Sequence, residues 1–550
     1  MSGSGGDLRL DLLRKYTLPI VHIRQQLYDG RLSFFFGSGI VRDLKFPVWK
    51  KLIKGIVERV RAKGIEPPDN YSSLTYQTQI LFQKYRNKRL SDADIIALPN
   101  NGDQEATVRC EWRQLVHEVL YAKPKTRDPN AIDKHPYLSK LRPSLKKAAL
   151  IVNYNFDDVL ERLIQRHREA SEATKTLGYE SYWTPRPHTR PDRTPIYHPN
   201  GFLPANLQEK HSETLIFSED EFADQLTDLS GSNYQYLFSN ITRNTCLLIG
   251  LSLDDGTLKN LLRQNAKAHP GNFHYYVRYL DGPDELSEHE RKAISDANFE
   301  IYNLVTLFLT KHEHGALAEL LNMAPPSDSN DPDEFEELAK GTSSKFVFYV
   351  AGCVASGKTT VISYFRNTYV FDEWLEPRIP EIVARSDRLS DAETAAADAW
   401  VLKQVSMKNA NIANMKSGIY FVDRAPLDAF AFTEFGRWKE KADMIEQTVC
   451  GVRPRVPLQN GHVILLRGNP EEMETRMRLR GRPEIDVAYL TNQQDLLRKV
   501  YDGRGASFID TESRSPSQIA RHVARLVFQG EYQEFDCDGQ LTILKVTGTS

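Results

Sequence analysis

Short apolar runs bounded by turn residues alternate with longer helical patterns, such as Trp49–Ala62 and Ala106–Val119, along most of the chain. A run of four or five apolar residues between turns is typical of a strand buried on both faces, and strands that alternate with helices form parallel sheets. The candidate strands are Leu32–Phe36, Ala149–Val152, Thr194–Tyr197, Thr214–Phe217, Cys246–Ile249, Phe273–Val277, Phe346–Val350, Gly418–Val422, His462–Leu466 and Ala506–Ile509. The predicted fold class is α/β, with two doubly wound parallel sheets.

A polar, acid-rich stretch at 324–345 separates two groups of strands. It contains three prolines and has no apolar period until Phe346, which is typical of an exposed linker. The chain has 550 residues, enough for roughly two to four domains of ordinary size. We therefore predict domains at 1–323 and 346–535, joined by this linker and followed by a C-terminal tail at 536–550.

Charge and cysteine usage exclude several classes of protein. Lys plus Arg number 71 against 73 Asp plus Glu, a balance that argues against a main role in binding nucleic acid. No apolar run approaches the roughly 18–20 residues that cross a bilayer, and the first residues lack the apolar core of a signal peptide. The five cysteines are scattered without CxxC spacing, so neither disulfides nor a cysteine zinc site is expected. We expect a soluble, cytoplasmic protein.

The segment Gly352–Thr359 fits the phosphate-loop pattern GxxxxGK[ST], between the apolar strand KFVFYVA and a helical stretch. Glycines let the backbone N–H groups of such a loop face phosphate oxygens at a helix N-terminus. Lys358 would reach the β- and γ-phosphates, and the Thr359 hydroxyl would bind Mg²⁺. The residues predicted to hold ATP or another nucleoside triphosphate are Gly352, Ser356, Gly357, Lys358, Thr359 and Thr360.

Two further features follow strands in this second half. Asp423 and Arg424 come directly after four apolar residues, where they would serve Mg²⁺ or a phosphate, or form only a surface ion pair. A second group follows the strand HVILLR and comprises Arg476, Arg478, Arg480 and Arg482. Clustered arginines are typical of a lid over transferring phosphoryl groups, although a solvated basic helix face has the same composition.

With these motifs, residues 345–528 resemble the deoxynucleoside-kinase and thymidylate-kinase-like group. The resemblance rests on the phosphate loop, the DRxxxD stretch Asp423–Asp428, RGRPE and Tyr489-Leu490. It implies that an acidic residue after the second strand activates a nucleoside hydroxyl, and the candidates are Asp372, Glu373, Glu376 and Glu381. We favour Glu376, because Glu-Pro resembles the pattern of that group. The resemblance leaves open whether this half turns over or only senses a nucleotide.

Four segments of the first half also stand at predicted strand ends. They are Gly37-Ser38-Gly39, Asn155-Phe156-Asp157-Asp158, His198-Pro199-Asn200-Gly201 and Gly250-Leu251-Ser252-Leu253-Asp254. Each has an ordinary structural interpretation: a lone GSG is a weak phosphate-binding signal, and Asn155 and Asp157 suit helix caps. His198 alone is more often a structural histidine than a catalyst.

In this order, the four segments resemble the sirtuin-like fold in its bacterial antiviral-defence branch, over most of residues 25–320. The resemblance implies NAD as the substrate and assigns the pyrophosphate to the Gly37–Gly39 loop. It assigns the nicotinamide ribose to Asn155 and Asp157. The adenosine side would contact Gly250, Ser252 and Asp254.

One departure concerns the base of that family. Asn200 stands where the family has histidine before glycine, and an amide cannot take a proton near neutral pH. His198 lies two residues earlier and, in an extended segment, would share its face. The two CxxC pairs of deacylating sirtuins are missing from the sequence, so we expect NAD hydrolysis without zinc instead of deacylation.

Together the two halves suggest an effector joined to a sensor. The kinase-like half would detect a nucleotide signal of phage infection, and the sirtuin-like half would then hydrolyse NAD to nicotinamide and ADP-ribose. We expect a homo-oligomer with low basal activity, a phage-derived trigger and no membrane partner. The alternatives are a nucleoside or nucleotide kinase regulated by NAD or ADP-ribose, and a signalling scaffold built from two binding modules.

Overall fold

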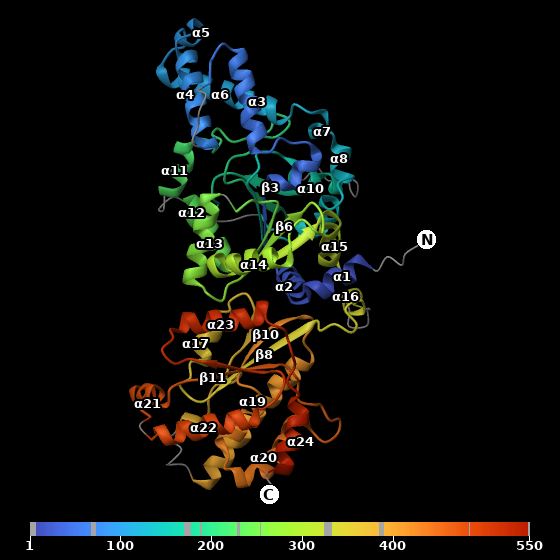
Figure 1. Ribbon diagram of the computed structural model, residues 1–550, viewed down its shortest axis with the longest axis vertical. Helices are drawn as coiled ribbons and strands as arrows, with labels where there is room; N and C mark the ends of the chain where they lie inside the picture. Colours follow the sequence, from blue (N-terminus) through green and yellow to red (C-terminus); the bar gives the residue numbers. More distant parts are fainter. Residues whose placement is uncertain are drawn as a thin grey trace. The chain divides into compact units, whose positions relative to one another are not determined.

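The computed structural model describes residues 7–67, 73–169, 178–186, 190–227, 232–253, 255–323, 333–383, 390–482 and 484–547. The chain forms two compact units (Figure 1). Unit 1 comprises Met1–Tyr16, Gln26–Lys267 and Phe273–Leu338, and unit 2 comprises Thr17–Gln25, Ala268–Asn272 and Ala339–Ser550. Part of the predicted linker, 324–332, lies outside the described residues, and the rest contains a short helix whose Phe335 is buried.

Unit 1 is built on a seven-stranded sheet in which every strand pairing is parallel. Its strands are β1 (Leu32–Phe36), β2 (Leu150–Asn153), β3 (Tyr179–Tyr182), β4 (Thr194–Tyr197), β5 (Thr245–Ile249), β6 (His274–Leu280) and β7 (Leu304–Thr310). The order is β3-β4-β2-β1-β5-β6-β7, so the chain runs outward from β1 on one side and then returns to the other side at β5. The gap between the carboxyl ends of β1 and β5 is therefore the topological switch point, where open α/β sheets bind ligands.

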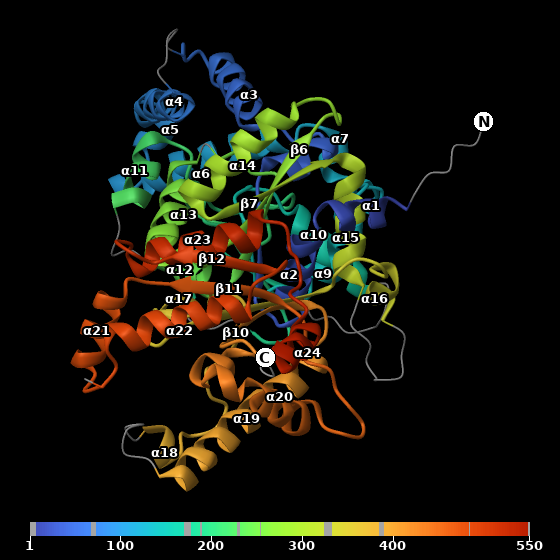
Figure 2. The same cartoon turned by 60° about the horizontal axis from the view of Figure 1, so that its bottom comes forward.

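Helices cover both faces of this sheet. The helices of the chain from Leu8 to Leu338 are α1 (Leu8–Lys15), α2 (Thr17–Tyr28, assigned to unit 2 up to Gln25), η1 (Ser38–Leu44), α3 (Trp49–Ala62), α4 (Leu74–Leu90), α5 (Ala93–Ile96), α6 (Asn101–Leu120), α7 (Pro124–Arg127), α8 (Pro129–Asp133), α9 (Leu138–Leu145), α10 (Val159–Glu169), α11 (Glu219–Thr227), α12 (Ser232–Arg243), α13 (Gly256–Ala268), α14 (Glu288–Tyr302), α15 (Lys311–Asn322) and α16 (Glu334–Leu338). Helices α12 and α13 pack Leu237, Leu258 and Leu262 against one sheet face, while the blue helices α3 to α6 gather at one end of the unit (Figures 1 and 2).

Unit 2 has a five-stranded sheet, also with parallel pairings throughout, in the order β12-β11-β8-β10-β9. The strands are β8 (Lys345–Gly352), β9 (Tyr369–Phe371), β10 (Gly418–Asp423), β11 (His462–Arg467) and β12 (Ala506–Asp510). Strand β8 is central, and the chain crosses from its β10 side to its β11 side, so β8 and β11 flank the switch point of this sheet.

The helices of unit 2 also form two layers. They are α17 (Lys358–Ile362), α18 (Pro380–Val383), α19 (Asp391–Ala413), η3 (Asp428–Phe432), η4 (Phe435–Arg437), α20 (Trp438–Ile445), η5 (Glu446–Cys450), α21 (Pro470–Leu479), α22 (Val487–Val500), α23 (Pro516–Gln529) and α24 (Cys537–Thr547). Figure 1 shows α17 and α23 on one side of the sheet and α19, α20, α22 and α24 on the other. Capping boxes fix the starts of α19 and α23, where Ser390 pairs with Glu393 and Ser515 with Gln518.

The predicted fold class, α/β with two parallel sheets, is confirmed. One expected strand is wrong: Thr214–Phe217 is an extended loop in which the Ile216 N–H donates to the Asn200 carbonyl and the Phe217 ring packs on Trp49. Strands β3, β7 and β9 were not anticipated. Within the described residues, no helix combines the length and apolar character required for a membrane span.

Candidate functional site

The carboxyl ends of β1 and β5 carry two glycine loops that pack backbone against backbone. The Gly37 N–H donates to the Ile249 carbonyl at 3.1 Å, and the Gly39 N–H donates to the Gly250 carbonyl at 2.9 Å. A Cβ on Gly37 would lie 2.6 Å from the Gly250 oxygen, and Gly250 itself has a φ of +70°. The glycines are therefore required by the contact between the loops, and these two N–H groups point at protein carbonyls.

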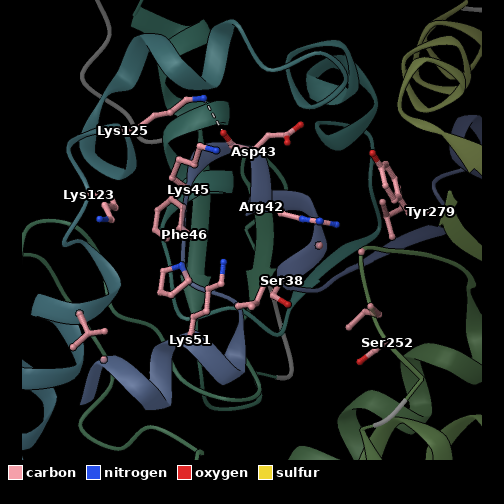
Figure 3. A pocket seen from close by; sticks show the side chains of 18 of the residues that line it. Ser38, Arg42, Asp43, Lys45, Phe46, Lys51, Lys123, Lys125, Ser252 and Tyr279 are labelled. Carbon is pink, nitrogen blue, oxygen red and sulfur yellow. Dashed lines mark hydrogen bonds between the residues drawn. The ribbon is translucent and has the colours of Figure 1, made fainter. Parts of the chain in front are cut away.

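A cavity of about 1750 Å³ opens beside these loops. Ser38 and Gly39 line it from the first loop, and Gly250 and Ser252 line it from the second, so the structure brings two of the predicted cofactor-binding segments to one site (Figure 3). Asp254, predicted to contact the adenosine side, lies outside the described residues. The cavity is at the switch point of the sheet, where the sequence places its ligand.

Asn155 connects the loop after β2 to the loop after β1. Its side-chain N–H donates to the Gly37 carbonyl at 3.1 Å, and its backbone N–H donates to the Asn153 side chain at 3.1 Å. The residue is 9% exposed. The loops after β1 and β2, which are far apart in the sequence, therefore meet through the Asn155 amide.

Asp157 lies at the amino end of α10, where its Oδ1 accepts the Val159 N–H at 3.1 Å. It therefore caps the helix, which is the structural role that its sequence context also allowed. The side chain is buried, and burial raises the pKa of Asp157 to about 7. This carboxyl accordingly exchanges a proton near neutral pH.

His198 has no exposed surface, and both ring nitrogens have partners. Its Nδ1 lies 3.2 Å from the Asn155 carbonyl, and its Nε2 lies 2.7 Å from Oε1 of Glu161, which also accepts the Ser181 hydroxyl at 2.6 Å. A carbonyl oxygen only accepts, so Nδ1 is the donor in the contact with Asn155. In this geometry His198 holds the Asn155 backbone in place.

Asn200 occupies the position that histidine has in the resembled family. Its Nδ2 donates to the Tyr154 carbonyl at 3.3 Å, whereas its Oδ1 is buried with no hydrogen-bond partner in the described part of the chain. Gly201 follows with a φ of +104°, which favours glycine. The orphaned Oδ1 is an acceptor next to the Asn155 segment, where a ligand N–H or O–H would satisfy it.

In unit 2, the loop after β8 has the shape of a phosphate loop. Gly352, Ala355 and Gly357 have φ values of +145°, +62° and +95°, a curl that turns successive N–H groups inward. The Lys358 ammonium folds over this curl and donates to the Gly352 and Cys353 carbonyls at 2.9 and 3.0 Å. Burial lowers the pKa of Lys358.

The other predicted loop residues lie around the same curl. Ser356 is buried, and its Oγ has no partner among the described residues, while Thr360 is exposed at the start of α17. The Thr359 hydroxyl donates to Oδ2 of Asp423 at 2.7 Å, so the phosphate loop and the end of β10 meet. Oδ1 of Asp423 is buried without a described partner.

That orphaned carboxylate oxygen beside a hydroxyl is a donor set that suits Mg²⁺, which prefers oxygen ligands and is usually completed by water and substrate phosphates. A cluster of three or more His, Cys, Asp or Glu side chains able to hold a metal ion does not occur in the described part of the chain. Thr359 and Asp423 would therefore hold the ion together with the phosphates.

A second cavity, of about 570 Å³, lies in unit 2 and is lined by Glu373, Trp374 and Arg424 among others. Glu373 pairs with Arg424 at 2.6 Å, and the Arg424 guanidinium also stacks over Trp374 at 5.4 Å. The favoured Glu376 instead pairs with the Lys403 ammonium at 2.8 Å and is not among the cavity-lining residues. The structure thus places Glu373, a weaker sequence candidate, in the cavity.

The arginines predicted to form a lid divide into two groups. Arg476 donates to the Ala355 carbonyl of the phosphate loop at 3.1 Å, and Arg480 and Arg482 line the unit 2 cavity. Arg478 pairs instead with Glu474 at 3.1 Å on its own helix. Three of the four therefore lie where a bound nucleotide would meet them.

Two residues of these sites were not anticipated from the sequence. Glu161 sits inside α10 and contributes a buried carboxyl to His198, and Lys408 sits inside α19 and donates to the Asp423 and Glu373 carbonyls at 2.7 and 2.8 Å. Burial lowers the pKa of Lys408 to about 8. Each residue is one of several charged positions on its helix, and only the packing against the sheet brings it to the site.

Comparison with known proteins supports the first half of the assignment. Residues 149–302 match the family model described as SIR2-like domain, which includes the Asn155, His198 and Gly250 segments. This range confirms the sirtuin-like resemblance of the sequence. A search of curated proteins found no match.

Similar solved structures are nucleotide-metabolising kinases. A deoxyadenosine kinase from M. mycoides with bound dATP is 17% identical, covers 32% of this chain and 97% of its own, and has a TM-score of 0.27. The same enzyme with dCMP and a flexible dCDP bound is 19% identical, covering 34% and 100%, with a TM-score of 0.28. Thymidylate kinase from Candida albicans is 13% identical, covering 35% and 96%, with a TM-score of 0.25.

Proposed function

We propose that unit 1 hydrolyses NAD to nicotinamide and ADP-ribose. The observation that carries this proposal is the contact between the Asn155 amide and the Gly37 loop, beside the cavity at the switch point. Asn155 lies within the SIR2-like range 149–302. Ser38 and Ser252 line that cavity from either side of the switch point, where they would contact the pyrophosphate and the adenosine side. Dinucleotides bind α/β sheets at this position.

In the reaction, the bond between the ribose C1′ and the nicotinamide nitrogen breaks, and its electron pair leaves with nicotinamide. A water oxygen then bonds to C1′ and gives up one proton. Asn155 orients the ribose, and His198 positions Asn155 through its backbone carbonyl. Asp157, two residues from Asn155, has a pKa of about 7, the range that suits a group accepting this proton.

Unit 2 acts in this proposal as the sensor. Its phosphate loop and 570 Å³ cavity bind a nucleotide that signals phage infection, and this binding triggers NAD hydrolysis in a bacterial cytoplasm. Basal activity is low, since unregulated loss of NAD would kill the host. The protein works as a homo-oligomer, and depletion of NAD stops the infected cell from supporting the phage.

The test is chromatography of NAD incubated with the full chain, with and without Mg²⁺ and a panel of nucleosides and nucleotides. Nicotinamide and ADP-ribose should appear, most strongly with one member of the panel. The Asn155→Ala variant is the control for contaminating hydrolases. Intact NAD under every condition, with a folded wild-type protein, would reject the proposal.

A second candidate is a nucleoside or nucleotide kinase that unit 1 regulates by binding NAD or ADP-ribose. The contact of Thr359 with Asp423 favours it, together with the Glu373–Arg424 pair in the neighbouring cavity. Bound Mg²⁺ would neutralise charge on the transferring phosphoryl group. Glu373 would accept the proton of the acceptor hydroxyl, while Arg480 and Arg482 would neutralise the phosphates.

The same incubation separates the two candidates. A newly phosphorylated nucleoside with intact NAD favours the kinase, and nicotinamide release without a phosphorylated product favours the effector. Lys358→Ala should abolish turnover if the protein is a kinase. If it is an effector, the same variant should keep basal NAD hydrolysis and lose its stimulation by nucleotide.

A further inference from the structure

Unit 1 has a second cavity, of about 1170 Å³, beside strand β3 and helix α10. Tyr179, Ser181 and Trp183 line it from β3 and the residue that follows, and Glu161 lines it from α10. None of its described lining residues also lines the cavity at the switch point. We call this space the β3 cavity, and it is large enough for a small-molecule ligand, since sites for such ligands usually measure about 300–1,000 Å³.

A buried carboxylate oxygen in the β3 cavity has no partner. Glu161 is 2% exposed, and its Oε1 lies 2.7 Å from Nε2 of His198 and accepts the Ser181 hydroxyl at 2.6 Å. Its Oε2 is buried without a hydrogen-bond partner in the described part of the chain. Because an unsatisfied buried acceptor costs free energy, a ligand N–H or O–H that reaches this oxygen is favoured.

The β3 cavity also has an aromatic surface. Trp183 is half-buried, and its ring stacks on Phe202 with a centroid distance of 6.2 Å and an interplanar angle of 19°. Both residues line the cavity, and Phe202 in turn packs on His198 at a centroid distance of 4.5 Å. A rigid aromatic pair beside a cavity is a surface on which a planar heterocycle packs favourably.

Positive charge remains in the β3 cavity after its ion pairs are counted. The basic lining residues are Arg162, Arg186, Arg190, Arg193 and Lys210, and the acidic ones are Asp158, Glu161, Glu180 and Glu209. Ion pairs at 2.9 and 2.6 Å join Arg162 to Asp158 and Arg186 to Glu180, and Glu161 contacts His198. Three basic side chains therefore face the single remaining carboxylate, and this excess attracts an anion.

Two of these three basic side chains come from the segment that leads into β4. Arg190 is exposed, and its guanidinium has no ion-pair partner among the described residues. Nε of Arg193 is buried, lies 4.0 Å from Oδ2 of Asp192 and has no hydrogen-bond partner in the part of the chain that the structure describes. Guanidinium groups match phosphate oxygens in charge and in donor geometry, so this pair suits a phosphate group.

Strand β3 brings the acceptor, the aromatic surface and the arginines close together. Ser181 contacts Glu161, and Trp183 stacks on Phe202. Glu180 accepts the backbone N–H of Arg190 at 3.4 Å. Residues 180–183 extend over roughly 10 Å, because successive residues of a strand rise by about 3.3 Å. One mononucleotide covers this span.

We propose that the β3 cavity binds a nucleoside monophosphate whose base carries an exocyclic amino group, such as AMP. The base packs on Trp183 and donates from its amino group to Oε2 of Glu161, and the phosphate meets Arg190 and Arg193. This binding does not depend on the hydrolysis proposed for unit 1. The ligand contacts the carboxylate that holds His198, so it lies next to the segment that positions Asn155.

The site is tested first by the fluorescence of Trp183 when AMP is added to the full chain. AMP should quench the emission, because the base stacks on the indole ring. Trp183→Phe should lose this part of the quenching, and any quenching that remains belongs to another tryptophan, such as Trp374 of the unit 2 cavity. If Trp183→Phe and the wild type are quenched equally at millimolar AMP, the inference is overturned.

The phosphate contact is tested by comparing AMP with adenosine, with the Trp183 signal reporting each affinity. AMP should bind about tenfold more tightly, the size expected of a charge-assisted hydrogen bond. The double variant Arg190→Ala/Arg193→Ala should remove this advantage and change adenosine affinity by less than about twofold. Arg31→Ala is the matched control, because Arg31 is an exposed arginine of the same unit that lines neither cavity.

Equal wild-type affinities for AMP and adenosine would overturn the inference. An equal loss of both ligands in the double variant would also overturn it, because the two arginines would then support the fold and not the phosphate.

The contact with Glu161 is tested with purine riboside 5′-monophosphate, which lacks the exocyclic amino group of AMP. It should bind about tenfold more weakly than AMP, since one hydrogen bond to a carboxylate is lost. Equal affinities would reject this contact and the proposed orientation of the base. Hydrolysis is a separate readout: if NAD stays intact while AMP binding depends on Trp183 and the arginines, the β3 cavity is a nucleotide site and only the hydrolase proposal fails.

Discussion

Both units place a glycine loop after a strand that borders the switch point of a parallel sheet, but the two loops are built differently. In unit 1 the Gly37 and Gly39 N–H groups donate to carbonyls at the end of β5. In unit 2 the loop has positive φ values at Gly352, Ala355 and Gly357, and its curl is filled by a lysine of the same loop. The same position in the fold thus carries a packing contact in unit 1 and, in unit 2, a curled loop of the shape that binds phosphate.

The supply of positive charge differs in the same way. In unit 2 the buried ammonium of Lys358 lies against the loop carbonyls, and a bound phosphate would draw this ammonium onto the phosphate oxygens. Unit 1 presents exposed lysines from separate segments across a wide cavity. A single buried charge suits one phosphate position, and a spread of exposed charges suits a long ligand with phosphates at several positions.

The largest expected effect comes from Lys358→Ala, which removes the charge of the unit 2 loop. ATP-dependent phosphoryl transfer should fall by about 10²–10³-fold, because a preorganised charge at the transferring phosphates is lost. Coupled assays of ATP turnover and titration with ATP measure this loss. Lys439→Ala, an exposed lysine on α20, is the control, and unchanged ATP binding in Lys358→Ala would contradict the assignment of the loop.

Asn155→Ala tests whether the Asn155 amide acts in catalysis, although the N–H groups of the neighbouring glycine loop donate to protein carbonyls. NAD hydrolysis should fall by about 10²-fold, the usual cost of one positioned hydrogen-bond donor, while ATP binding in unit 2 stays within about twofold. The measurement is nicotinamide release per minute at saturating NAD. Asn206→Ala, an exposed amide of the same unit, is the control. Equal rates in the wild type and Asn155→Ala would leave the Gly37 contact a packing feature only.

Asp157 and Asp428 offer a comparison of buried carboxyls in the two units. Burial raises their pKa values to about 7 and about 6, above the roughly 3.9 of an unfolded chain, so the folded state favours the protonated form. The resulting stabilisation is complete below about pH 4 and is lost as the pH rises through the folded pKa. For Asp157 the free energy of unfolding should fall by about 2–3 kcal/mol between pH 5 and pH 8.

Asp157→Asn should remove that part of the pH dependence and keep the cap on Val159, since the amide oxygen still accepts. Asp428→Asn should remove a smaller part that ends near pH 6, with the Tyr501 hydroxyl still bonded. Urea unfolding of each variant at a series of pH values measures both. If the free energy of unfolding of the wild type does not change between pH 5 and pH 8, as expected for Asp157→Asn, the raised pKa of Asp157 is contradicted.

The sheets and their motif-bearing ends were largely predictable, because local patterns define them. Leu32–Phe36 and Thr194–Tyr197 are strands with the predicted bounds, and the phosphate loop has its expected strand before it and helix after it. The strand predicted at Thr214–Phe217 is wrong because a buried loop contains the same apolar residue types as a buried strand. Strand β3 was missed because it lies at the sheet edge and is half exposed.

The partners inside the sites were not predictable, because they depend on packing between distant segments. Glu161 lies in α10 and His198 follows β4. The two residues are 37 positions apart in the sequence and meet only because these segments pack together. The sequence favoured Glu376 over Glu373, whereas in the fold Glu373 pairs with Arg424 and Glu376 pairs with Lys403. Local chemistry identifies the candidates, and tertiary contacts select among them.

The smallest expected effect separates the two glycine loops by stability. Gly250 has a φ of +70°, and its Cβ would lie 2.7 Å from the Ile40 nitrogen, whereas Gly357 has a φ of +95° and a Cβ there would meet no described atom within 4 Å. Gly357→Ala should therefore lower the free energy of unfolding by about 1–2 kcal/mol, because alanine disfavours the left-handed conformation. Gly250→Ala should lower it by about 1–2 kcal/mol more, because its Cβ also clashes with Ile40. Urea unfolding measures both free energies. If the two variants lose the same free energy of unfolding, the Gly250 loop can move away from β1. The glycine loop of unit 1 would then be as available for binding phosphate as the loop of unit 2.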